Sequence, residues 1–173
     1  MITIRSSRDE DIHRITEIYS YYVLNTTYTF EIDPPSAEEM TKRRIDVLSK
    51  HLPYLVAEQD GLVAGYASCN WFKPRAAYRF AAELSIFLHH DACGKGLGRQ
   101  LLNALIEKAE LAGIRKLIAV IGDSKNERSL ALHRAAGFSH VGTFKSCGWK
   151  FNRWLDVYLM DKTIGEGGTT PPE

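Results

Sequence analysis

The sequence predicts an α/β fold in which helices flank a mixed β-sheet, antiparallel in its first half and parallel in its second. Two runs of β-forming residues, 54–58 and 62–72, are joined by the turn Gln59-Asp60-Gly61, which is typical of a β-hairpin. The run 117–121 is apolar at every position, as a central parallel strand is, and a helix separates it from a strand predicted over 82–89. These observations predict the order β-α-α-β-β-β-α-β-α-β-β.

The N-terminal residues predict a strand followed by a helix. Ile2–Arg5 is expected to form a short strand. Ser7-Arg8-Asp9-Glu10 then has the spacing of a capping box, in which a Ser and a Glu side chain satisfy the first N–H groups of a helix. The helix that follows is expected to bury one apolar face, made of Ile12, Ile15, Ile18, Tyr19, Tyr22 and Val23.

A second capping box predicts the next helix. Ser36-Ala37-Glu38-Glu39 opens it, and it should end before Pro53. We expect its buried face to carry Met40, Ile45 and Leu48.

Glycines end the two helices of the second half. The first begins at Leu97 and ends at Gly113, and the second spans Asn126–Ala136 and ends at Gly137. Strands over 138–146 and 154–161 then complete the sheet.

Length and composition predict one domain. A chain of 173 residues can bury roughly 70% of its unfolded surface in a single core. We assign residues 1–164 to this domain and expect residues 165–173, which lack apolar side chains, to form a disordered tail.

The charge balance argues against nucleic acid or membrane partners. Lys and Arg number 22 and Asp and Glu 21, a formal net charge of +1, so no overall field attracts a polyanion. The N-terminus lacks the pattern of a signal peptide, and no apolar run reaches the length of a membrane span. The three cysteines, Cys69, Cys93 and Cys147, show no metal-site spacing and are expected to be reduced thiols. We therefore expect a cytoplasmic protein.

The turn Gly94-Lys95-Gly96-Leu97-Gly98 is the principal candidate binding motif. It lies between a predicted strand and a predicted helix, where backbone N–H groups point outward and glycine allows a phosphate to approach. The dinucleotide fingerprint G-x-G-x-x-G fails at Arg99, and no Ser or Thr follows Gly94-Lys95 as a P-loop requires. A turn that is merely tight remains the alternative.

Two motifs and the order of elements resemble the GNAT acyltransferases over nearly the whole chain. Cys93–Gly98 resembles the family's glycine-rich motif, and Asn126 with His133–Phe138 resembles its later Asn...Tyr-x-x-x-Gly-Phe pattern. Cys93 replaces the usual Arg or Gln, and His133 replaces the Tyr of most of the wider family. Three further stretches resemble the phosphinothricin and methionine sulfoximine N-acetyltransferases within this family: Trp71–Tyr78, Ala82–Leu88 and Gly148–Val157.

The resemblance implies a splayed mixed sheet, acetyl-CoA as co-substrate and a direct transfer of its acetyl group to an amine. It assigns Glu83 to the proton of the amine and His133 to the protonation of the CoA thiolate. A surface glutamate and a packed helix histidine are the alternatives for these two residues. The residues implied to bind acetyl-CoA are Ile86, Phe87, Leu88, Gly94, Lys95, Gly96, Leu97, Gly98, Arg99 and Asn126.

The implied acceptor is a small amino acid or analogue, such as phosphinothricin, methionine sulfoximine or methionine sulfone. Its predicted ligands lie in two loops, although arginines in loops are more often simply solvated: Tyr28, Phe30, Arg75, Ala76, Ala77, Tyr78 and Arg79.

No metal is expected. His89-His90-Asp91 offers ligand types, but adjacent residues of an extended strand point to opposite sides.

Two other functions stay open. A protein N-terminus or a polyamine could replace the small acceptor, and a CoA-binding sensor would lack turnover altogether. The aromatic residues Trp149 and Trp154, together with the resemblance, lead us to expect a homodimer.

Overall fold

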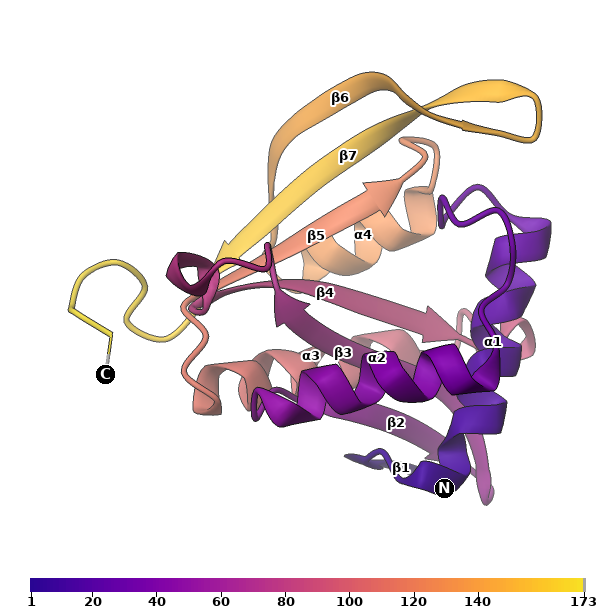
Figure 1. The fold of residues 1–173 in the computed structure, drawn as a ribbon, viewed down its shortest axis with the longest axis horizontal. Coiled ribbons are helices and arrows are strands. Elements are labelled where there is room, and N and C mark those ends of the chain that lie inside the picture. The colour runs from indigo at the N-terminus through magenta and orange to yellow at the C-terminus, as the bar shows by residue number, and fades with distance from the viewer. Residues whose placement is uncertain (173) are drawn as a thin grey trace.

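The computed structural model describes residues 1–172, and these contain the predicted order of strands and helices (Figure 1). Short 3-10 turns cover Asp9–Asp11, Ala76–Tyr78 and His90–Ala92. The main elements are β1 (Ile2–Ser6), α1 (Ile12–Asn25), α2 (Ala37–Ser49), β2 (Tyr54–Gln59), β3 (Leu62–Trp71), β4 (Ala81–Leu88), α3 (Leu97–Leu111), β5 (Lys116–Gly122), α4 (Glu127–Ala135), β6 (Ser139–Lys150) and β7 (Arg153–Thr163).

The seven strands form one sheet in the order β1-β2-β3-β4-β5-β7-β6. Neighbouring strands are antiparallel except β4 and β5, which are parallel. The predicted α/β fold with a mixed sheet is therefore confirmed. The expectation that the second half is parallel is wrong, because β7 pairs antiparallel with both β5 and β6. A single parallel pair, β4 with β5, joins two antiparallel halves.

That parallel pair is short, and the sheet opens beyond it. Pairing runs from Ala81↔Lys116 to Leu84↔Ala119, so the second half of β4 has no paired residue on β5. The two strands diverge from there (Figure 1). The gap exposes backbone that a continuous sheet would have hydrogen-bonded.

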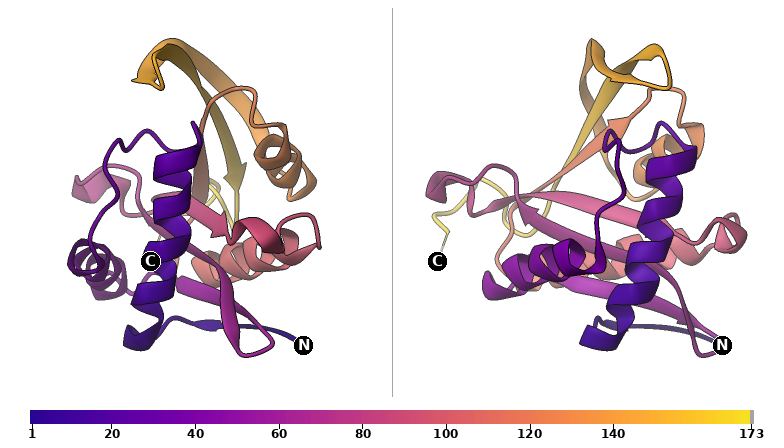
Figure 2. Two further views of the ribbon diagram at one scale, coloured as in Figure 1. Left: turned by 90° about the vertical axis from the view of Figure 1, so that its right-hand side faces the viewer. Right: turned by 45° about the vertical axis from the view of Figure 1, so that its right-hand side comes forward.

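Helices cover both faces of the sheet. α1 and α2 lie on one face, and α3 and α4 lie on the other (Figures 1 and 2). The predicted apolar face of α1 is buried, including Ile15 and Ile18, and α3 buries Leu101 and Leu105. Among residues 1–172, each helix is too short or too polar to cross a bilayer.

The first capping box was predicted one residue too early. The helix opens with the 3-10 turn Asp9–Asp11, and a carboxylate oxygen of Asp11 accepts the Arg8 N–H at 2.7 Å. Ser7 instead uses its hydroxyl to accept a hydrogen bond from Arg44 Nε at 2.8 Å. The Ser7 hydroxyl therefore binds Arg44, which is distant in sequence, and does not cap the helix.

The predicted buried face of α2 is partly wrong. Ser36 caps the helix as predicted, and Met40 is buried, but Ile45 and Leu48 are 57% and 39% exposed. Arg44 is buried in their place. Its guanidinium donates to the hydroxyl and carbonyl of Ser7 and pairs with Asp9.

The last two strands are longer than predicted. β6 and β7 continue to a turn at Phe151-Asn152, where both residues have positive φ. They form a ribbon that projects beyond the rest of the sheet (Figure 1). After β7, residues 165–168 form turns, and Arg115 donates hydrogen bonds to Gly167 O and Thr170 Oγ1.

Candidate active site

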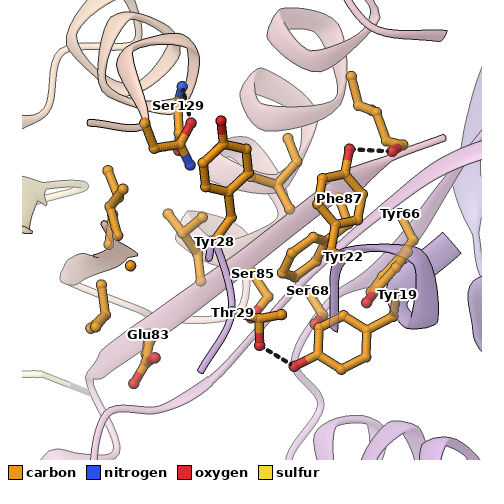
Figure 3. A pocket seen from close by; sticks show the side chains of 18 of the residues that line it. Tyr19, Tyr22, Tyr28, Thr29, Tyr66, Ser68, Glu83, Ser85, Phe87 and Ser129 are labelled. Atoms are coloured by element: carbon orange, nitrogen blue, oxygen red, sulfur yellow. Dashed lines mark hydrogen bonds between the residues drawn. The ribbon is translucent and has the colours of Figure 1, made fainter. Parts of the chain in front are cut away.

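A cavity of about 1060 Å³ occupies the opening between β4 and β5 (Figure 3). We call it the splay cavity. Its walls come from both strands, from α1, α2 and α4, and from the α1–α2 loop (residues 26–36). Eight of the predicted site residues line it: Tyr28, Phe30, Glu83, Ile86, Phe87, Leu88, Asn126 and His133.

Backbone groups of β4 face this cavity in alternation. Ala81 O accepts from Phe72 N, and His89 N donates to Ala64 O, so the odd-numbered residues of β4 bond to β3. In an antiparallel ladder the groups of Ile86 and Leu88 then point away from β3, toward the missing part of β5. Phe87 was predicted together with them, but its backbone groups belong to the β3 side.

Tyr22 hydrogen-bonds to one of these outward-pointing backbone groups. Its hydroxyl donates to Leu88 O at 2.6 Å and lies 3.8 Å from the Cys93 sulfur. Burial raises the pKa of Tyr22, which keeps the phenol protonated as a donor. The N–H and C=O of Ile86 and the N–H of Leu88 remain as candidate groups for a ligand.

The glycine turn holds the N-terminus of α3 beside the cavity. Gly94 and Gly96 have φ values of 79° and 80°, in the left-handed region that favours glycine. Gly98 serves close packing, since a Cβ there would lie 3.3 Å from the Leu88 side chain. Residues 94–99 lie outside the cavity lining, directly after Cys93, which belongs to it.

The N-terminus of α4 is a second helix end that favours binding of an anion. Asn126 is buried in the cavity wall, and its Oδ1 accepts the Ser129 N–H at 3.2 Å as a helix cap. Lys125 and Arg128 flank this cap and also line the cavity. The positive end of the helix dipole and two cations therefore lie together where a phosphate would be stabilised.

Glu83 presents a carboxylate to the cavity (Figure 3). Burial raises its pKa above the ordinary value of 4.5, and the charge of Lys73 partly opposes this shift. Among residues 1–172 its carboxylate has neither a hydrogen bond nor an ion pair, and the side chain of its cross-strand neighbour Asn70 donates to Asp46. Glu83 is thus an unengaged acceptor with raised proton affinity.

His133 is 2% exposed and lines the same cavity. Its Nδ1 lies 2.7 Å from the Ser129 carbonyl oxygen, which can only accept, so Nδ1 carries the hydrogen. Burial lowers its pKa, although the bond to Ser129 opposes this, so the protein favours the neutral ring. Nε2 then carries a lone pair that has no hydrogen-bond partner in the described chain. In this tautomer His133 must accept a proton before it can donate one.

The α1–α2 loop is fastened to the second half of the chain. Thr27 Oγ1 donates to Asp123 at 2.5 Å, and the buried Lys150 donates to Thr29 O at 2.8 Å. Phe30 packs where a Cβ on Gly148 would collide with its ring. These contacts fix Tyr28 and Phe30 as a wall of the cavity.

The predicted acceptor ligands Arg75–Arg79 lie elsewhere. They are exposed and contribute nothing to the cavity lining, because they precede β4 at the end opposite its opening. Their role stays a prediction.

The expectation that His89 and His90 point to opposite sides of the chain is wrong. His89 ends the extended segment and His90 begins a 3-10 turn, so their rings stack with centroids 4.2 Å apart instead of pointing to opposite sides.

Comparison with known proteins assigns the family. Residues 4–159 match the acetyltransferase (GNAT) domain. The chain belongs to the GNAT acetyltransferase family.

Relatives of this GNAT acetyltransferase cover nearly its full length. It is 48% identical to a phosphinothricin N-acetyltransferase from Alcaligenes faecalis over 99% of this chain and 87% of that protein. It is 35% identical to an L-methionine sulfoximine/L-methionine sulfone acetyltransferase from Salmonella typhimurium, over 95% and 96% of the two chains. The crystal structure of a phosphinothricin acetyltransferase from Sinorhizobium meliloti with AcCoA superimposes with a TM-score of 0.96 at 43% identity, over 99% and 93%.

Several cavity residues of this GNAT acetyltransferase were missed from the sequence. Lys125 and Arg128 carried a usable signal, since cations flank a cap directly after a buried strand. Tyr22 and Ser129 carried none, because their roles depend on contacts with β4 and with the His133 ring.

Proposed function

We propose that this protein transfers the acetyl group of acetyl-CoA to the α-amine of a small amino acid or analogue: phosphinothricin, L-methionine sulfoximine or L-methionine sulfone. The observation that carries the proposal is the splay cavity, which joins free β4 backbone and the N-terminus of α4 to the unengaged carboxylate of Glu83. The names of the relatives support this acceptor class.

In this proposal acetyl-CoA binds along the opening of the sheet. The outward groups of Ile86 and Leu88 hydrogen-bond the pantetheine arm. The diphosphate binds the N–H groups after Gly94 and Gly96, with Lys125 and Arg128 adding positive charge. Asn126 contributes by capping the helix that carries Arg128.

The chemistry begins with loss of a proton from the acceptor ammonium to Glu83. The free amine attacks the thioester carbonyl carbon, and an outward N–H of β4 stabilises the oxyanion. His133 Nε2 takes the second proton from the attached nitrogen. The C–S bond then breaks, the amide forms, and the imidazolium of His133 returns that proton to the thiolate.

Tyr28 and Phe30 enclose the acceptor side chain in this scheme. Arg75 and Arg79 are proposed to bind its acidic groups and Tyr78 its side chain, with Ala76 and Ala77 in the same segment. This segment lies outside the cavity lining and would have to close over the acceptor to do so.

A homodimer is proposed from the aromatic ribbon. Trp149 and Trp154 pack edge to face at 5.2 Å and are 53% and 63% exposed, with Phe144 and Phe151 exposed beside them. Light scattering should give twice the chain mass, and Trp154→Lys should lower it; a monomeric wild type would refute the dimer. The unpaired cysteines favour a cytoplasmic location.

Initial rates of thiol release from acetyl-CoA across an acceptor panel test the function. We expect turnover with phosphinothricin, L-methionine sulfoximine and L-methionine sulfone, and little with a short peptide or spermidine. Turnover only with peptide or spermidine would overturn the acceptor class. Binding of acetyl-CoA without turnover would favour a sensor.

A further inference from the structure

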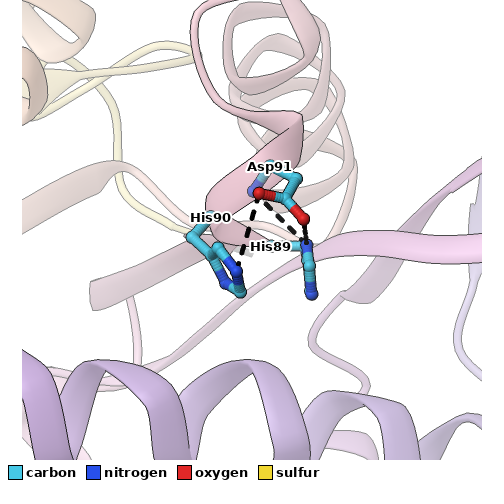
Figure 4. A group of neighbouring side chains, drawn as sticks. All are labelled: His89, His90 and Asp91. Carbon is cyan, nitrogen blue, oxygen red and sulfur yellow. Dashed lines mark hydrogen bonds and ion pairs between the residues drawn. The ribbon is translucent and has the colours of Figure 1, made fainter.

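A compact group of metal-ligand atoms lies outside the splay cavity. His89, His90 and Asp91 each offer one such atom, and these atoms all lie within 4.8 Å of one another (Figure 4). The cluster spans the connection between β4 and the glycine turn that leads into α3.

The two separations that involve Asp91 come close to those around a small tetrahedral ion. His89 Nδ1 lies 3.9 Å from Asp91 Oδ2, and His90 Nε2 lies 3.6 Å from Asp91 Oδ1. Bonds of about 2.0–2.1 Å place neighbouring ligands of a tetrahedral Zn²⁺ about 3.4 Å apart. Rotation of the side chains has to close the difference and to release the Asp91 N–H, which His89 Nδ1 accepts at 3.4 Å. The Asp91 side chain is 81% exposed and has room to rotate.

Packing holds the two imidazoles on the same side of the chain. Tyr21 of α1 stacks on His90 with centroids 4.3 Å apart, and His90 stacks on His89 at 4.2 Å. The 3-10 turn brings the Asp91 carboxylate back toward both rings (Figure 4). The nearby cation Arg14 is paired with Glu17 at 2.7 Å, which limits its repulsion of a bound ion.

We propose that His89, His90 and Asp91 bind one Zn²⁺ ion, with solvent completing the coordination. Two imidazoles and one carboxylate form a donor set that suits borderline divalent metals, and the open position is accessible because His90 and Asp91 are exposed. The ion is separate from the proposed acetyl transfer, in which no step uses it. It crosslinks the end of β4 to the turn before α3.

Calorimetric titration of the untagged full-length chain with Zn²⁺ tests this site. We expect one ion per chain. The affinity should fall by at least about tenfold in both His90→Gln and Asp91→Asn, because loss of a ligand costs no less than loss of an outer-shell partner. Zn²⁺ should also raise the melting temperature of the wild type more than that of either variant.

Two matched variants separate this site from other surface ligands. His140→Gln removes another exposed histidine, and Cys147→Ser removes the exposed thiol; both should keep the wild-type affinity. Four results would overturn the proposal: no binding, equal binding by all variants, loss of affinity in His140→Gln or Cys147→Ser, or loss in only one of the two ligand variants.

Discussion

Glu83 and His133 reach the splay cavity from different elements, and burial disfavours the charged form of each. The pKa of the carboxyl is raised and that of the imidazole is lowered, so both act as proton acceptors near neutral pH. His133 is held in one tautomer by Ser129, which directs its lone pair away from that bond. The shifted pKa values of these two residues lead to two predictions, one on activity and one on stability.

Removing the base at position 83 should abolish most activity without unfolding the protein. We expect kcat/KM of Glu83→Gln to fall about 100-fold to 10,000-fold, since a positioned general base contributes that much. Acetyl-CoA binding measured by calorimetry should persist, and Glu107→Gln on the exposed face of α3 is the control. In the wild type, kcat/KM should fall as pH drops through the Glu83 pKa, which lies above 4.5. Full activity of Glu83→Gln would exclude its role.

Burial of His133 should make the fold sensitive to acid. Its folded pKa lies below 6.5, so the unfolded chain takes up a proton first as pH falls. The stability contributed by the neutral ring is present above pH 6.5 and is lost as pH falls below it, by up to about 1.4 kcal/mol per pH unit. Urea unfolding from pH 7.5 to 5 should therefore give a steeper decline for the wild type than for His133→Gln. Equal slopes would contradict the lowered pKa.

At the scale of elements, the site depends on how loops are fastened. Asp123 has a φ of 66° and accepts hydrogen bonds from Thr27 and from the Lys125 N–H, and it pairs with Arg153. One carboxylate thus joins the α1–α2 loop, the β5–α4 turn and β7. The cavity wall that carries Tyr28 is set by the second half of the chain.

Releasing this loop should weaken binding of the amine substrate more than binding of acetyl-CoA. In Thr27→Val the buried Asp123 carboxylate loses a donor, which should lower the free energy of unfolding by about 1–3 kcal/mol. KM for the acceptor should rise while KM for acetyl-CoA changes little, because Tyr28 and Phe30 shift. Thr27→Ser keeps the hydroxyl and should restore both quantities. Identical behaviour of the two variants would exclude the hydrogen bond as the cause.

The glycine turn should be sensitive to a single methyl group. Gly96 caps α3 with a φ of 80°, and a Cβ there would meet no neighbouring atom within 4 Å, so only backbone strain is added. We expect Gly96→Ala to lose roughly 1–2 kcal/mol of stability and to raise KM for acetyl-CoA. Gly142→Ala is the matched control, because its Cβ would also be free of contacts and its φ is not positive. Equal KM values for acetyl-CoA in the two variants would show that the glycine turn does not bind acetyl-CoA.

For the whole molecule, the sequence predicted what local patterns determine. The order of elements, the hairpin and the glycine turn follow from periodicity and turn residues, and the mixed sheet follows from that order. Arg44 could not be predicted as buried, because its partners Ser7 and Asp9 are 37 and 35 residues away.

The candidate site was predictable where motifs lie on single elements. Glu83 and Asn126 line the cavity as expected, and His133 does too, but its tautomer depends on the carbonyl of Ser129. The contact between Thr27 and Asp123 spans 96 residues and leaves no local pattern. Contacts between residues far apart in the sequence therefore account for most of what was missed.

The bond formed in the reaction tests the central claim most directly. Acetyl-CoA labelled with carbon-13 at the acetyl carbonyl would be incubated with phosphinothricin labelled with nitrogen-15 at its amine, and the carbonyl signal followed by NMR. The proposed transfer predicts an amide carbonyl split by the labelled nitrogen that grows at the rate of thiol release. Acetate without nitrogen coupling, or an unchanged thioester, would contradict it.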